Sequence, residues 1–182
     1  MSIGMWTYSS SKRKRILTIA AVFIVAVIVT VIGSFVPLNA QDAQQINNDL
    51  NQTITTMQTQ GTLTQYIFGN NMIICLVMFI PIIGPVLGLS IMYTTGTVVG
   101  AIATSGGYPP LLAFVALFIT PVAWLEFISY STAMAESIWL FRRLLQGRGF
   151  REHRNMSVFV TICAIILAVS AFIEVALISV GA

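Results

Sequence analysis

The longest apolar run of the chain, residues 70–140, is interrupted by prolines, paired glycines and two isolated acids. The whole sequence is 57% hydrophobic and 8% charged, whereas an average soluble domain is about a quarter charged. A soluble domain of 182 residues could not cover so much apolar surface. The bilayer must therefore act as part of the solvent, and we expect one all-α, polytopic membrane domain over residues 1–182.

All nine basic residues fall in two clusters, Lys12–Arg15 and Arg142–Arg154. Basic segments beside membrane spans lie mostly on the cytoplasmic side and attract anionic lipid headgroups. Neither cluster carries the interleaved aromatic residues of a single-strand nucleic-acid groove. We therefore expect lipid contacts at both clusters, no nucleic-acid partner, and a location in the cytoplasmic membrane.

Residues 16–37 form the first expected span, with the N-terminus cytoplasmic and Pro37 ending the helix. A cleaved secretory signal is the alternative, although the apolar part of such signals usually has about 7–15 residues. Residues 39–65 contain no base and have apolar residues at spacings of three and four, which predicts an outer amphipathic helix. Residues 157–180 form the last expected span, which places the C-terminus outside.

The core segment, residues 70–145, is too long and too interrupted for simple spans. A straight helix over residues 72–103 would be nearly 50 Å long, against a bilayer core of about 30 Å. We therefore expect helix breaks at Pro81, Pro85 and Pro121, and either two short helices joined inside the membrane or a tight hairpin. Because residue 39 is expected outside and residue 142 inside, an odd number of crossings lies between them, and about five spanning units result. The alternative for the first two units of the core, which are short, is that one or both are re-entrant.

Four glycines, spaced by multiples of four residues, form a ridge: Gly84, Gly88, Gly96 and Gly100. Small residues at this spacing allow close approach of another helix. The ridge predicts either packing inside the chain, or self-association or contact with another membrane subunit.

Polar residues of the core define the candidate site. Glu126, Ser129, Thr132 and Glu136 share one face of the predicted helix after Pro121, together with Ser137. Intramembrane carboxylates need partners, water or a proton. For Glu126 we consider a structural role and a ligand or transport role, with Asn70 and Asn71 lining the same cavity; for Glu136 we expect an ion pair with Arg142 or Arg143.

Residues for catalysis are not evident in the sequence. It contains no nucleophile–base set, phosphate loop or metal-ligand spacing. Cys75 and Cys163 lie in apolar runs, and His153, the one histidine, lies in the basic loop. We therefore expect no enzyme, no metal site and no cofactor.

The order Asn70-Asn71, Gly84, Gly96, Gly100, Pro121 and Glu126 resembles the stage II sporulation protein M family of integral membrane proteins. The segment from Thr120 to Phe127 is similar to that family's Pro-His-Gly-x-x-Glu-like motif, with Val122 and Ala123 in place of the His and Gly. Thr95-Gly96 stands where the family has Asn-Gly. The resemblance implies a scaffold or transport-like membrane role and no reaction.

Two functions remain open from the sequence. The first is a non-enzymatic scaffold or accessory subunit of a larger membrane complex, which packs through the glycine ridge. The second is a small channel or transporter that uses Glu126 and Glu136, because broken helices beside intramembrane acids are typical of transporter sites.

Overall fold

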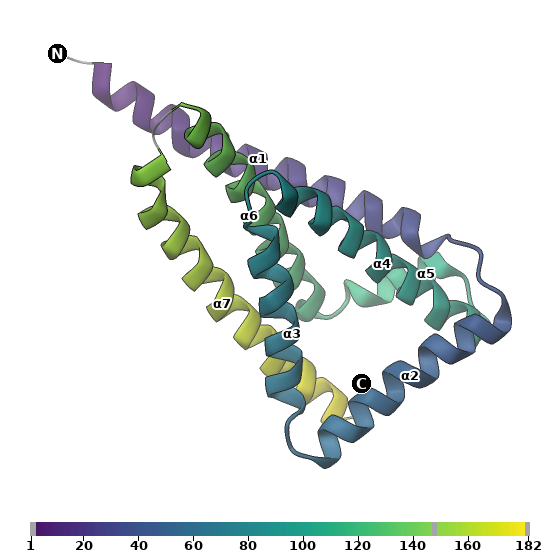
Figure 1. Ribbon diagram of the computed structural model, residues 1–182. Coiled ribbons are helices and arrows are strands. Elements are labelled where there is room, and N and C mark those ends of the chain that lie inside the picture. Colours follow the sequence, from purple (N-terminus) through teal and green to yellow (C-terminus); the bar gives the residue numbers. More distant parts are fainter. Residues whose placement is uncertain (1–2, 147–148, 181–182) are drawn as a thin grey trace.

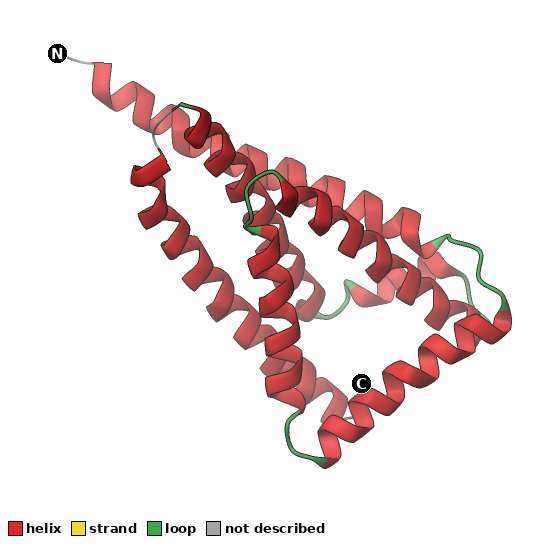
Figure 2. Ribbon diagram, viewed as in Figure 1, coloured by secondary structure: helices red, strands yellow, loops and turns green. Residues whose placement is uncertain are grey.

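The chain is helical throughout the part that the computed structural model describes, which comprises residues 3–146 and 149–180, with side chains for 12–146 and 155–180. Figure 2 shows helices joined by short loops, with no strand among these residues. The helices are α1 (Ile3–Ser34), α2 (Ala40–Thr59), α3 (Leu63–Met78), α4 (Ile83–Gly106), α5 (Pro110–Leu117), α6 (Pro121–Leu145) and α7 (Gly149–Val180). The expected all-α architecture is confirmed.

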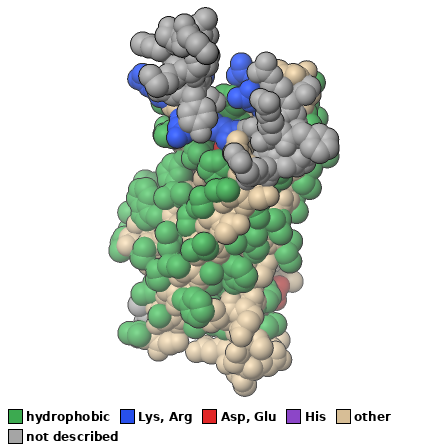
Figure 3. All heavy atoms as spheres, turned by 90° about the vertical axis from the view of Figure 1, so that its left-hand side faces the viewer, with side chains coloured by type: hydrophobic (Ala, Val, Ile, Leu, Met, Phe, Trp, Pro, Cys, Tyr) green, Lys and Arg blue, Asp and Glu red, His purple; other side chains and the backbone are tan. Residues whose placement is uncertain are grey.

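The helices form a tapering bundle with two different ends (Figure 1). At one end, which we call the basic end, α1 begins and α6 is followed by α7. At the other end α2 lies across the bundle, close to the C-terminal end of α7. In a space-filling view, apolar side chains cover the middle of the molecule and Lys and Arg gather at the basic end (Figure 3).

Three helices of the described residues are long and apolar enough to cross a membrane, namely Lys12–Ser34, Ile83–Gly106 and Asn155–Val180. α5 and α6 together form a fourth candidate span that is bent by 84°. α3 has 16 residues and is only about 24 Å long, which is short of a bilayer core. The four candidate spans and α3 together correspond to the five expected units, of which α3 is the short one.

α3 and α4 form a hairpin whose two open ends face the α2 end (Figure 1). The turn at residues 79–82 includes Pro81, and Ile82 has a φ of 70°, a conformation that is unusual for a β-branched residue. Ser137 of α6 donates a hydrogen bond of 2.6 Å to the carbonyl of Ile80. Backbone groups in a membrane interior need such partners, so α6 stabilises the turn.

Several expected boundaries are wrong by a few residues. α1 ends at Ser34 instead of Pro37, because the residue before a proline is disfavoured in a helix. Pro85 does not break a helix, because it lies in the first turn of α4, where a proline is tolerated. Asn70 and Asn71 lie inside α3, which begins at Leu63, and α4 continues to Gly106. Pro121 is the first residue of α6, directly after the bend.

The glycine ridge packs inside the chain. A Cβ atom on Gly96 would lie 2.0 Å from the carbonyl oxygen of Thr30 in α1, and one on Gly100 would lie 2.5 Å from that of Ser34. A Cβ atom on Gly84 would meet the carbonyl of Met78 at 2.1 Å, and one on Gly88 would meet the side chain of Met134. The ridge is therefore covered by α1, by the end of α3 and by α6. Of the two alternatives that the sequence left open, packing inside the chain is the one observed.

The close contact between α1 and α4 gives a first prediction. Gly96→Ala places a methyl group where the Thr30 carbonyl lies, so we expect it to lower the free energy of unfolding by about 1–3 kcal/mol. Gly69→Ala in α3 is the matched control, because a Cβ atom there has nothing within 4 Å. Thermal unfolding in mild detergent measures both changes. Equal stability of the two variants would contradict the packing described here.

Candidate functional site

A cavity of about 530 Å³ lies between α2 and the bundle. Its lining comes from α2, α3, α4, α6 and α7, so five helices define it. The apolar face of α2, which includes Ile46, Leu50 and Ile54, turns toward the cavity, while Ala43 of the same helix is fully buried. The amphipathic helix thus covers the protein's own cavity. The polar lining residues include Asp49, Thr53, Asn70, Asn71, Glu126 and Glu174.

The floor of the cavity is built around Glu126 of α6. The Asn71 side chain, from the middle of α3, donates a hydrogen bond of 2.5 Å from Nδ2 to Oε1 of Glu126. Asn71 is buried, with 9% of its surface exposed. Glu174 of α7 lines the same cavity. The hydrogen bond joins α3 to α6, and both carboxylates face the same space.

The ionisable Asp, Glu, Lys, Arg and His side chains that line the cavity are all acidic. Asp49, Glu126 and Glu174 line it, and none of its lining residues is Lys, Arg or His. The remaining wall is mainly aliphatic and aromatic, and includes Ile67, Ile91, Met92, Phe127 and Tyr130. This combination of an apolar wall with a few convergent polar groups is typical of small-molecule binding sites.

The structure brings three predicted residues together in this cavity, namely Asn70, Asn71 and Glu126. It does not bring in Ser129 or Thr132. Their hydroxyl groups donate to the carbonyls of Leu125 and Ile128, one turn earlier in α6, at 2.9 Å and 2.7 Å. Both hydroxyl hydrogens are therefore used within the helix, and neither side chain lines the cavity.

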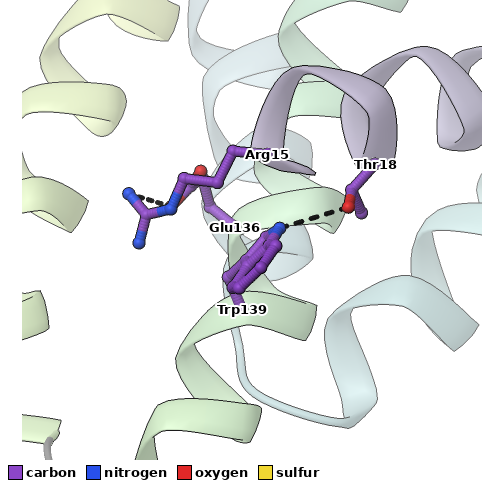
Figure 4. Close-up of polar contacts among 4 residues, drawn as sticks. All are labelled: Arg15, Thr18, Glu136 and Trp139. Atoms are coloured by element: carbon purple, nitrogen blue, oxygen red, sulfur yellow. Dashed lines mark hydrogen bonds and ion pairs between the residues drawn. The ribbon is translucent and has the colours of Figure 1, made fainter. Parts of the chain in front are cut away.

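Glu136 belongs to a second polar site near the basic end. Its Oε2 atom lies 3.4 Å from Nη1 of Arg15, and both side chains are largely buried, with 3% and 13% exposed. Figure 4 shows this pair beside Trp139, whose Nε1 donates a 3.2 Å hydrogen bond to Oγ1 of Thr18. The expected pairing of Glu136 with Arg142 or Arg143 is therefore wrong. Arg142 instead lies over the Trp139 ring, with 5.5 Å between its guanidinium carbon and the ring centroid.

The two glutamates are separated by a dry layer. Glu136 follows Glu126 by ten positions in α6, or about 15 Å along the helix axis. Phe127, Met134, Met78 and Met92 occupy the intervening core and are buried. Cys75 and Cys163 belong to the same core cluster as free thiols. The cavity therefore does not continue to the Arg15–Glu136 pair in this structure.

Sequence reasoning missed Arg15, Asp49 and Glu174 as parts of these sites. The sequence placed Arg15 only in a lipid-facing basic cluster. Spacing within one helix carries no information on which other helix will lie beside it. The signal that was available for Glu174 was its isolation, because an acid within an apolar span needs a partner, water or a proton.

The structure describes the side chains of only part of the two basic clusters. Lys12, Arg13, Lys14 and Arg142 are exposed at the basic end. Arg148 lies outside the described residues, and the side chains of Arg151, His153 and Arg154 also lie outside the described part. Over the described ranges, no three His, Cys, Asp or Glu side chains gather closely enough to hold a metal ion.

The buried ion pair gives a second prediction. Arg15→Met leaves the Glu136 carboxylate buried without its cation, so we expect a loss of about 3 kcal/mol in the free energy of unfolding. The double variant Arg15→Met/Glu136→Gln removes that charge and should recover most of the loss. Arg13→Met, at an exposed position, is the control. If the two changes of the double variant simply add, the pair is not coupled and this description of Glu136 is wrong.

Comparison with known proteins identifies the family of the chain. The family model described as stage II sporulation protein M matches residues 16–178, which span every helix from α1 to α7. Neither the curated proteins nor the solved structures include a match. The resemblance seen in the sequence is confirmed, and the chain belongs to the stage II sporulation protein M family.

Proposed function

We propose that this protein binds a small solute in the cavity beneath α2 and moves it across the membrane. The observation that carries the proposal is the hydrogen-bonded pair of Asn71 and Glu126 at the floor of a cavity that five helices line. Buried carboxylates that face a cavity within membrane helices commonly mark substrate or ion pathways.

The helix breaks support the same proposal. α6 begins directly after the bend of 84° that separates it from α5, and Glu126 lies in its second turn. Transporters commonly place their binding sites beside such discontinuous helices. The Arg15–Glu136 pair and the dry layer above the cavity would then keep the basic end shut while the solute site is accessible from the α2 end.

We also propose how the protein is oriented in the membrane. Because basic residues next to spans are retained on the cytoplasmic side, we place the basic end in the cytoplasm and α2 outside. In this orientation the cavity receives its solute from the outer side. The proposal involves no chemical step, since the cavity lining contains no nucleophile beside a general base.

A flux assay tests the transport proposal. In proteoliposomes with an imposed membrane potential, we expect uptake of radiolabelled tetraethylammonium above that of empty liposomes. Glu126→Gln should reduce this uptake by at least about tenfold, because it removes a carboxylate from the pathway. Asp42→Asn is a matched control, since Asp42 lies in α2 and does not line the cavity. Flux that both variants leave unchanged would rule out a pathway through Glu126.

A second candidate function is that of a scaffold or accessory subunit, which the family resemblance implies. The exposed face of α2 favours it, since that face carries amide side chains at Gln41, Gln44, Gln45, Asn48, Asn51 and Gln52. Because the glycine ridge is occupied within the chain, a partner would have to bind elsewhere, and this amide face is the available polar surface of α2.

Purification of the tagged protein in mild detergent tests the second candidate. A scaffold should bring along larger membrane subunits in fixed stoichiometry, and replacing Gln44 and Asn48 by Lys should release them. The control is Gly69→Ala in α3, where a Cβ atom has nothing within 4 Å. A protein that purifies alone, whatever the variant, would argue against a scaffold.

A further inference from the structure

We infer that the solute of the cavity is a small organic amine, in which an ammonium group is attached to an apolar body. This inference rests on the proposed function and names its substrate class. Three features of the lining carry it: the sign of the charge, the absence of a cage for a metal ion, and the apolar wall.

The charges select a cation. Asp49 on α2 and the two glutamates on the floor give the lining three carboxylates and no basic side chain. An anion would find no positively charged side chain in this lining. A neutral solute would offer Glu126 and Glu174 no opposite charge, whereas an ammonium group supplies one and favours the ionised form of both side chains.

The lining is unsuited to a metal ion. Calcium needs six to eight oxygen ligands, and no three His, Cys, Asp or Glu side chains gather to hold a metal ion among the described residues. Sodium sites in membrane proteins use carbonyls of unwound backbone. None of the cavity residues comes from the stretches between helices, at 35–39, 60–62, 79–82, 107–109 and 118–120, so their carbonyls are engaged in helices.

The wall suits an apolar body. Ile46, Leu50 and Ile54 cover the cavity from α2, and Ile67 and Ile91 approach from α3 and α4. Tyr66 and Tyr130 also line it, and aromatic rings attract ammonium groups. The cavity volume of about 530 Å³ lies within the range of about 300–1,000 Å³ that drug-sized ligands occupy.

Equilibrium dialysis of the full chain in lipid nanodiscs tests the inference, with radiolabelled phenethylamine as the probe. Phenethyl alcohol is the neutral probe of nearly the same shape, and empty nanodiscs correct for partitioning into lipid. We expect saturable binding of the amine that is at least about tenfold tighter than binding of the alcohol. Sodium and calcium chloride should not compete beyond the general effect of ionic strength.

Two variants connect the binding to the cavity. Glu126→Gln keeps a side chain that can bond to Asn71, and it should weaken amine binding by about tenfold. Asp49→Asn, at an exposed position on α2, cannot disturb the bundle core and should weaken binding by about threefold, since exposed charges are screened. Asp42→Asn should have no effect.

The outcomes separate the inference from the proposed function. Binding of the amine that follows this order of variants supports both. Tighter binding of the alcohol or of a metal ion, when it is lost in Glu126→Gln, overturns the amine assignment and leaves a solute site in place. If no probe binds a wild-type protein whose thermal unfolding is cooperative, both the amine assignment and the solute-binding proposal fail.

Discussion

The contact between the backbones of α1 and α4 is the constraint on which the rest of the structure depends. Lipid tails are as apolar as the side chains of a helix, so close packing and interhelical hydrogen bonds replace the hydrophobic effect as the source of helix association. Here Gly96 and Gly100 of α4 face the carbonyls of Thr30 and Ser34, and Gly33 of α1 faces the carbonyl of Tyr93. No larger residue allows that approach, because a Cβ atom at Gly33 or Gly96 would lie within 2.2 Å of a carbonyl oxygen.

This contact positions the parts that build the cavity. α4 is held against α1 along its length, and the turn at residues 79–82 then places α3 beside α6 and α7. Asn71 on α3 thereby reaches Glu126 on α6. α2 connects α1 to α3 across the same end of the bundle, so its apolar face has the cavity beneath it. At the basic end, Arg15 of α1 meets Glu136 of α6. One close helix pair therefore aligns both polar sites.

The all-α fold and the helix breaks could be predicted from the sequence, because apolar runs, prolines and glycines determine the local backbone structure. The break near Pro81, the bend before Pro121 and the amphipathic character of α2 follow from such local signals. The proximity of Asn71 to Glu126 was anticipated as a shared cavity. The sequence did not predict that Arg15 of α1 lies beside Glu136, or that Glu126 of α6 shares a cavity with Glu174. In both cases the two residues are far apart in the chain. The residues of α1 that face the glycine ridge, Thr30, Gly33 and Ser34, were likewise unremarkable in an apolar helix until α4 was placed against them.

The central claim is that a water-accessible acidic cavity exists beneath α2 and is closed toward the basic end. Cysteine accessibility in oriented membrane vesicles tests it most directly, and the native Cys75 and Cys163 are buried and should stay unreactive. Asn70→Cys should react with a membrane-impermeant cationic thiol reagent added at the α2 side, and more slowly with an anionic reagent of similar size. Ser131→Cys, at a fully buried position of α6, should react from neither side. An Asn70→Cys variant that resists both reagents, or a Ser131→Cys variant that reacts from the basic side, would contradict the account.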